Sequence, residues 1–103
     1  MTNDHAMAIY DGYPVTPGHS LIIPKRHIAS FFEANIVEQV AMLELLAEMR
    51  ELLQKEQNPD GFNIGINDGT AAGQTVMHLH IHLIPRYAGD MEDPRGGVRW
   101  IMP

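Results

Sequence analysis

Short apolar runs separated by turn residues dominate the first part of the chain. One such run covers residues 6–10 and ends at Asp11-Gly12-Tyr13-Pro14, and a second covers residues 19–24 after Thr16-Pro17-Gly18. Apolar runs between turn signals are typical of β-strands. The short connection between these two runs predicts an antiparallel pair.

Residues 36–57 have apolar side chains at intervals of three and four, which predicts one long amphipathic helix. Asn35 precedes this segment and Glu38 follows three residues later, as in a capping box. A shorter helical turn is expected over residues 29–33. The apolar stripe indicates a core or a subunit interface and consists of Met42, Leu45, Leu46, Met49, Leu52 and Leu53.

Two further strands are expected in the C-terminal half. Phe62, Ile64 and Ile66 share one face of a strand over residues 62–67, and a loop of small residues at 68–73 leads to a strand within 74–85. Residues 86–103 are rich in Gly and Pro and are predicted to be irregular. The pattern therefore predicts a single domain over residues 1–103 with an α+β fold: a mainly antiparallel sheet, one long helix and one short helix.

The strand within residues 74–85 carries three histidines at alternate positions. His78, His80 and His82 point to one face, and the other face is apolar and consists of Leu79, Ile81 and Leu83. Chance seldom places three side chains that titrate near neutral pH on one side of one strand. The histidine face is therefore the candidate functional site.

Composition narrows the class of protein. The 103 residues carry a net charge of −6, which argues against a nucleic-acid backbone binder because such proteins normally present a basic face. The absence of cysteine excludes disulfides, thiolate zinc sites and cysteine nucleophiles. No apolar stretch approaches the roughly 18 residues of a membrane span, and the N-terminus has no secretory leader. We expect a soluble cytoplasmic protein that binds neither nucleic acid nor a membrane.

Three interpretations of the histidines are open at this point. In the first, they are ordinary polar residues of a solvent-facing strand. In the second, they hold a metal ion together with Asp11, His19 or Asp68. Strand geometry opposes one ion bound by all three, because the Cα atoms of His78 and His82 would lie about 13 Å apart. Two nitrogens on one zinc lie within about 4 Å of each other.

In the third interpretation, the histidines perform nucleophilic chemistry on phosphorus. Neutral imidazole attacks phosphorus, and the phosphoramidate that forms is readily hydrolysed. Such a site needs a nucleophile, a group that holds its tautomer, a proton donor for the leaving group, and donors around the phosphate oxygens. Three neighbouring histidines can meet the first three needs, and the loop 69–75 offers backbone N–H groups with Gln74 and Thr75 for the fourth.

The run His78-Leu79-His80-Ile81-His82-Leu83-Ile84 matches the signature of the histidine triad family. The similarity extends, in the family's order, to Ile9-Tyr10-Asp11, to residues 17–27, and to Asn67-Asp68-Gly69 with Gly73-Gln74-Thr75. Residues 74–90 most closely resemble the fragile-histidine-triad branch, which cleaves dinucleoside polyphosphates. They are less similar to the branch that cleaves nucleoside phosphoramidates.

The resemblance implies a nucleotidyl hydrolase or transferase that acts at the α-phosphorus through a nucleotidyl-histidine intermediate. It implies that His80 is the nucleophile, that the carbonyl of His78 fixes its tautomer, and that the His78 side chain meets His19. His82 would contact the phosphate and the leaving group. The other positions would bind substrate: Asn67, Gly73, Gln74 and Thr75 at phosphate oxygens, Asp11 at the ribose hydroxyls, and Ile9 and Leu21 at the base. His5 and His27 are expected to be surface or structural residues.

The resemblance implies no required cofactor and no protein-bound metal, although a divalent cation can accompany a polyphosphate substrate. Triad proteins are usually homodimers joined through the long helix and an adjoining strand, so a homodimer is also implied. Three alternatives to a dinucleoside polyphosphate hydrolase stay open: a nucleoside phosphoramidate hydrolase, a nucleotide-binding module without turnover, and a metal-dependent phosphohydrolase.

Overall fold

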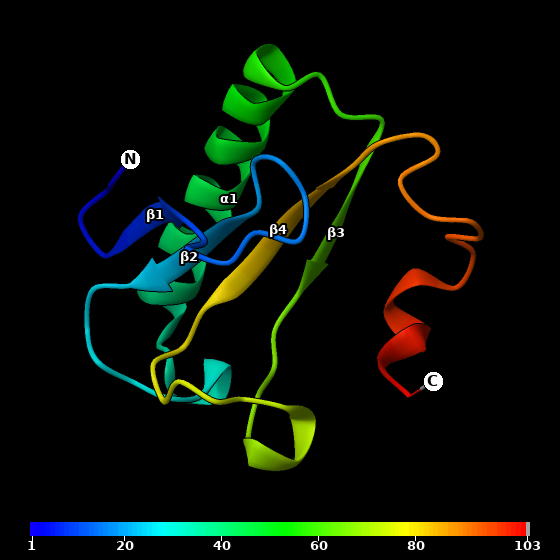
Figure 1. The fold of residues 1–103 in the computed structure, drawn as a ribbon. Coiled ribbons are helices and arrows are strands. Elements are labelled where there is room, and N and C mark those ends of the chain that lie inside the picture. The colour runs from blue at the N-terminus through cyan, green and yellow to red at the C-terminus, as the bar shows by residue number, and fades with distance from the viewer. Residues whose placement is uncertain (103) are drawn as a thin grey trace.

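In the computed structural model, which describes residues 1–102, four antiparallel strands form one sheet in the order β1-β2-β4-β3 (Figure 1). The strands are β1 (Ala6–Tyr10), β2 (Ser20–Pro24), β3 (Gly61–Gly65) and β4 (Ile81–Arg86). The long helix α1 (Ile36–Glu56) crosses one face of the sheet, and three 3-10 helices lie in the described connections and tail: η1 (Phe31–Glu33), η2 (Thr70–Ala72) and η3 (Gly97–Ile101). The predicted α+β fold is confirmed.

Helix α1 begins where the sequence predicts. The Glu38 N–H donates to the Asn35 side chain at 2.8 Å and the Asn35 N–H donates to the Glu38 carboxylate at 3.0 Å, which completes the capping box. Arg26, just beyond β2, donates two hydrogen bonds to Glu38 at 2.9 and 2.8 Å. These bonds, together with the one from Asn35, lower the pKa of Glu38 to about 2. They tie the first turn of α1 to the end of β2.

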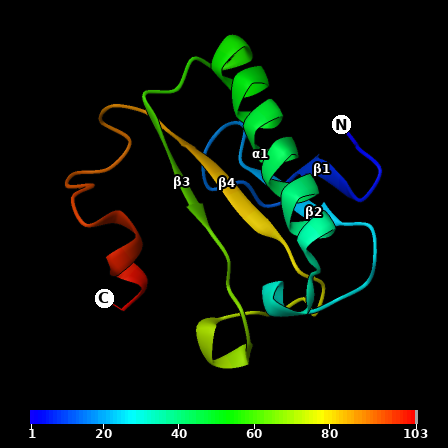
Figure 2. The same ribbon diagram turned by 180° about the vertical axis from the view of Figure 1, so that it is seen from behind.

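The predicted apolar stripe of α1 packs on the sheet and forms the core. Figure 2 shows α1 on the near side of the sheet, in front of β1 and β2. Leu46 and Leu52 at the edge of the stripe are partly buried. The fully packed residues of the stripe and of the facing strands include Met42, Leu45, Met49, Leu53, Ile22, Ile81 and Leu83.

Strand β3 lies at the edge of the sheet and is only partly covered. Ile64 pairs with Leu83 and so faces the same side of the sheet, yet it is 49% exposed. The reason is that α1 packs mainly over β1 and β2, toward the opposite edge of the sheet. The strand also ends at Gly65, two residues earlier than predicted.

The histidine strand is shorter than predicted, because β4 begins at Ile81 and contains only His82 of the three histidines. In the register of β2 with β4, Leu79 would lie opposite Pro24, and proline has no N–H to continue the ladder. The predicted alternation nevertheless holds, because the three apolar residues Leu79, Ile81 and Leu83 are buried.

The C-terminal tail is not wholly irregular. Strand β4 extends to Arg86, whose guanidinium binds Asp90 at 2.6 and 2.7 Å and Asn63 at 2.7 Å, and η3 follows beside β3. Within the described residues, no helix has the length and apolar character that a membrane crossing needs. The cytoplasmic location stays a prediction.

Candidate active site

The strand register gathers the predicted site residues on the sheet face opposite α1. Ile9 pairs with Leu21 and Leu21 pairs with His82, so these side chains form one row across three strands. The same register, continued past the strand ends, brings His80 next to Asn67 in the neighbouring row. Residues far apart in the sequence therefore share one surface.

A cavity of about 630 Å³ lies on this face, and all three histidines of the signature line it. Other predicted residues that line it are Ile9, Asp11, Leu21, Asn67, Gly73 and Thr75. Three lining residues, Tyr13, Ile23 and Val76, were not predicted. Ile23 could have been found from its spacing of two from Leu21, whereas Tyr13 and Val76 lie outside the strands and follow no period. None of the described lining residues is Lys or Arg.

His80 has one ring nitrogen free for chemistry. Its Nδ1 lies 2.8 Å from the carbonyl oxygen of His78, and because a carbonyl only accepts, Nδ1 carries the proton. The Nε2 atom of the neutral ring then has an available lone pair. The predicted contact between the His78 carbonyl and His80 is therefore present.

His82 is oriented by a series of hydrogen bonds that we call the histidine relay: Val15 N–H to His19, and His19 to His82. The Val15 N–H donates to Nδ1 of His19 at 3.2 Å, so the proton of the neutral His19 ring lies on Nε2. This Nε2 donates to Nδ1 of His82 at 2.9 Å. The neutral His82 ring therefore carries its own proton on Nε2, as a hydrogen-bond donor for the cavity.

Burial favours the neutral form of both rings in the relay. Burial lowers the pKa of His19 below its ordinary value, and the carboxylate of Asp11, 3.4 Å from His19 Nε2, opposes this effect. Burial also lowers the pKa of His82, with further lowering by His80 and His19 and opposition by Asp11. Both imidazoles are therefore neutral at neutral pH.

Asp11, His19 and His82 are also close enough to be considered as a metal site. One ligand atom from each lies within 4.8 Å of the others. A metal ligand needs an unprotonated atom, however, and the hydrogen bond from Val15 N–H places the proton of His19 on the nitrogen that faces the cluster. The arrangement therefore fits a hydrogen-bond relay better than a metal site.

The structure corrects the predicted partner of His78. Its Nε2 donates to the carbonyl of Pro24 at 2.9 Å, and its Nδ1 lies 2.9 Å from Nδ1 of His27. In the register of β2 with β4, position 78 lies opposite position 25, near His27, whereas His82 lies near His19. The expected contact of His78 with His19 is therefore wrong, and exposed His27 supports His78 instead.

The structure also corrects the predicted role of Gln74, which is buried outside the cavity lining. Its amide nitrogen donates to the carbonyls of Ala29 and Val76, and its oxygen accepts from the Gly69 N–H at 2.8 Å. Both donors are thus used to hold the loop, and none is left for a phosphate. The Gly73 N–H is likewise taken, by the carbonyl of Thr70 at 3.0 Å.

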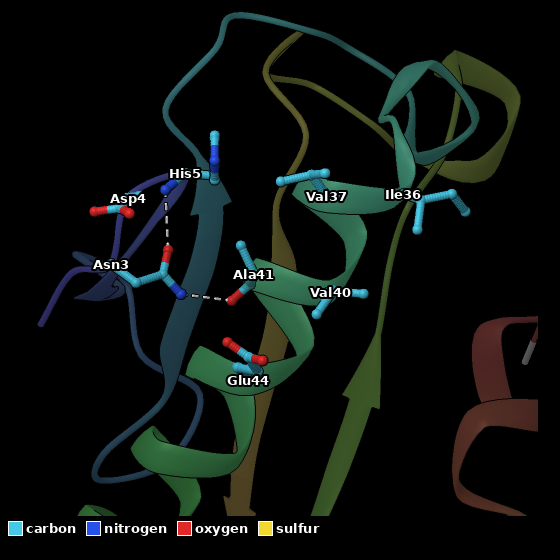
Figure 3. A pocket seen from close by; sticks show the side chains of 8 residues that line it. All are labelled: Asn3, Asp4, His5, Ile36, Val37, Val40, Ala41 and Glu44. Carbon is cyan, nitrogen blue, oxygen red and sulfur yellow. Dashed lines mark hydrogen bonds between the residues drawn. The ribbon is translucent and has the colours of Figure 1, made fainter.

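A second hollow, of about 440 Å³, lies between the N-terminal segment and α1 (Figure 3). Its lining on α1 is mostly apolar, with Ile36, Val37 and Val40, but also includes the carboxylate of Glu44. Exposed His5 lies at its rim, and Asn3 links the two sides by a 2.8 Å bond to the carbonyl of Ala41. No nucleophile with a fixed tautomer lies there among the described residues, so the histidine cavity is the candidate active site.

A profile of the HIT domain family matches residues 1–89. The chain belongs to the HIT family. An uncharacterized 16.1 kDa HIT-like protein of Mycoplasma pneumoniae is 40% identical to this HIT domain over 85 residues, or 82% of the chain and 59% of the relative. The AP-4-A phosphorylase of Mycobacterium tuberculosis is 32% identical over 84 residues, or 81% of the chain and 43% of that protein. Adenylylsulfatase HINT3 of Arabidopsis thaliana is 39% identical over 88 residues, or 85% of the chain and 45% of that protein.

Solved structures show the same HIT fold. The NitFhit protein of C. elegans superposes with a TM-score of 0.84 at 33% identity, over 97% of this chain and 24% of that one. This HIT domain spans only 43–59% of the length of the relatives named above. The AP-4-A phosphorylase and the adenylylsulfatase are named for different reactions, so these relatives do not identify a branch of the family. Closeness to the fragile-histidine-triad branch therefore stays a prediction.

Proposed function

We propose that this protein is a nucleotidyl hydrolase or transferase that acts at the α-phosphorus of nucleotides through a His80 adduct, with dinucleoside polyphosphates as its preferred substrates. The observation that carries the proposal is the fixed tautomer of His80. Its Nδ1–H is held by the His78 carbonyl at 2.8 Å, which leaves Nε2 as a nucleophile in the cavity. The names of two relatives, an AP-4-A phosphorylase and an adenylylsulfatase, also support nucleotide chemistry.

The proposed reaction has two steps. In the first, the lone pair of His80 Nε2 forms a bond to the α-phosphorus, and the bond from phosphorus to the leaving oxygen breaks. The His82 Nε2–H donates a hydrogen bond to that oxygen as negative charge develops on it. In the second step, water forms the new phosphorus–oxygen bond, the phosphorus–nitrogen bond breaks, and neutral His80 is restored while the proton of water passes to solvent.

The remaining lining residues fit the parts of a nucleotide. The Asp11 carboxylate accepts hydrogen bonds, which suits the two ribose hydroxyls, and Ile9 and Leu21 form an apolar surface for the base. Asn67 and Thr75 offer donors to phosphate oxygens. We propose that no protein-bound metal or cofactor is required. Because Lys and Arg are absent from the described lining, a divalent cation that accompanies the substrate would neutralise the phosphate chain.

The decisive experiment is to trap the adduct. Protein that has been treated with a chelator to remove bound metal, and then freed of the chelator, is mixed with diadenosine tetraphosphate and Mg²⁺. The reaction is quenched in alkaline denaturant, because phosphorus–nitrogen bonds hydrolyse in acid. Intact mass should show one added adenylyl group, which should be absent in His80→Ala. His5→Ala is the matched control, since His5 is exposed outside the cavity.

Measurements of activity, metal dependence and binding on the same proteins separate the alternatives. Full activity of His80→Ala would end the proposal. Activity that needs stoichiometric zinc or manganese would favour a metal-dependent phosphohydrolase, and tight binding without product would favour a binding module. A parallel reaction with an adenosine phosphoramidate shows which leaving group the enzyme prefers.

We also propose that the protein is a homodimer. Three exposed apolar side chains, Ile36, Val40 and Leu43, follow one another at helical spacing on α1, and Ile64 of edge strand β3 is half exposed. Mass measurement by light scattering should give twice the chain mass, and Val40→Asp should shift it to the monomer mass. A wild-type protein that is monomeric at micromolar concentration would contradict this proposal.

A further inference from the structure

Tyr13 is an exposed aromatic residue at the rim of the histidine cavity. Tyr13 is one of the residues that line the cavity, yet it is 91% exposed, more than the other large apolar and aromatic residues of the described chain. An aromatic ring left open to water beside a binding cavity has its faces free for stacking. Packing within the described structure does not explain its position.

The backbone of Tyr13 is fixed to the catalytic machinery. Its N–H donates to Oδ1 of Asp11 at 2.8 Å, and Oδ2 of the same carboxylate lies 3.4 Å from Nε2 of His19. His19 in turn holds His82, the residue that faces the leaving oxygen in the proposed reaction. Pro14 follows directly and restricts the backbone of Tyr13 to extended conformations. The backbone of Tyr13 is therefore held beside Asp11, at the rim of the cavity, and its ring extends into solvent.

The strands give the cavity one aliphatic surface, which suits a single base, and Tyr13 is the one Phe, Tyr or Trp among its described lining residues. Ile9, Leu21 and Ile23 form the aliphatic surface on the sheet. No Lys or Arg of the described lining can hold the phosphates of the leaving half. Stacking on an aromatic ring needs no charge and tolerates any base, because every base has a π-face.

We propose that Tyr13 stacks on the base of the leaving nucleoside and so selects dinucleoside polyphosphates over nucleotides that have the same phosphate chain but no second base. This inference rests on the proposed function, because it names the part of the substrate that occupies the rim of the same site. Stacking needs the ring and not the hydroxyl, so Tyr13→Phe should keep the selectivity that Tyr13→Ala loses.

The test compares two ligands that differ only in the second nucleoside, diadenosine tetraphosphate and adenosine 5′-tetraphosphate. Dissociation constants are measured in the His80→Ala background, which prevents turnover, with Tyr13→Ala, Tyr13→Phe and the control Tyr10→Ala. Tyr10 is also exposed but lies outside the cavity lining. Tyr13→Ala should weaken binding of the dinucleoside ligand by about 5- to 150-fold, which corresponds to about 1–3 kcal/mol of base stacking. Binding of adenosine 5′-tetraphosphate should change less than about twofold.

Two outcomes of the binding measurements overturn the inference. Equal losses for both ligands would place Tyr13 against the first nucleoside, and no loss for either would mean that the ring faces only solvent. Failure of the proposed function is a separate result, because it appears as the absence of a His80 adduct and of product in the wild-type protein. If the protein binds the dinucleoside ligand through Tyr13 but does not turn it over, the inference about Tyr13 stands and the proposed reaction is wrong.

Discussion

Replacing His19 by phenylalanine tests whether the hydrogen bond from His19 to His82 contributes to catalysis. The ring of His19 is buried, and phenylalanine keeps a flat ring of similar size there. The substitution removes the Nε2 donor that lies 2.9 Å from Nδ1 of His82. The proton of His82 is then no longer confined to Nε2.

The size of the effect distinguishes two roles of this bond. If His19 only fixed the tautomer, equal populations of the two neutral forms of His82 would lower kcat by about twofold. In the proposed reaction, negative charge on the leaving oxygen polarises His82 and strengthens the bond that its Nδ1 accepts. Hydrogen bonds to charged groups contribute about 1.5–3 kcal/mol, which predicts a decrease in kcat of about 10- to 150-fold. The substitution His82→Ala removes the donor itself and should lower kcat by about 10²- to 10⁴-fold.

The assay uses single-turnover rates with two substrates that share the adenylyl group. One is a phosphoramidate with a poor amine leaving group, and the other is a 4-nitrophenyl ester with a good one. His19→Phe and His82→Ala should both lose far more activity on the phosphoramidate. Loss of stability should be modest, about 1 kcal/mol or a decrease in Tm of about 4–8 °C, because exposed Val15 can give its N–H to water.

Two results would refute this reasoning. A loss of twofold or less on the phosphoramidate would show that the relay sets only the tautomer. Equal losses on both substrates would show that the substitution disturbs the site as a whole rather than the transfer of charge to the leaving group.

Three further predictions concern binding and stability. Asp11→Ala should lower the preference for ribose over 2′-deoxyribose substrates, because the carboxylate accepts from both hydroxyls; the ratio of kcat/KM values for the two sugars measures this. Burial lowers the pKa values of the two histidines of the relay, so the unfolded chain binds more protons in acid than the folded protein does. The free energy of unfolding should therefore fall as the pH drops below about 6.5. Urea midpoints at several pH values should show this dependence, and an unchanged midpoint would contradict it. Gly18→Ala should destabilise the protein by more than about 1 kcal/mol, because Gly18 has a φ of +90° and a Cβ there would lie 2.9 Å from Leu53 on α1. Gly12→Ala, where a Cβ meets nothing within 4 Å, should leave the thermal midpoint nearly unchanged.

Local features of the fold could be predicted because they depend on neighbouring residues. The alternation of Leu79, Ile81 and Leu83 with histidines decides which side of the chain is buried, since successive side chains of an extended backbone point to opposite faces. The cap of α1 could be predicted in the same way, because Asn35 and Glu38 bind each other's backbone within one turn. The contact of His80 with the carbonyl of His78 also spans only two residues.

The partners of the other histidines were decided by the tertiary structure. His19 and His82 are 63 residues apart in the sequence, and they meet because β2 and β4 pair in one particular register. The same register places His78 against His27 rather than His19. In the loop before His78, the amide of Gln74 binds backbone groups instead of facing the cavity. The sequence by itself determined that three imidazoles face one side and that His80 is the central one. Which of them is a free nucleophile and which is a supported donor depended on the groups lying opposite across the sheet, because the tautomer of an imidazole is set by its hydrogen-bond partners.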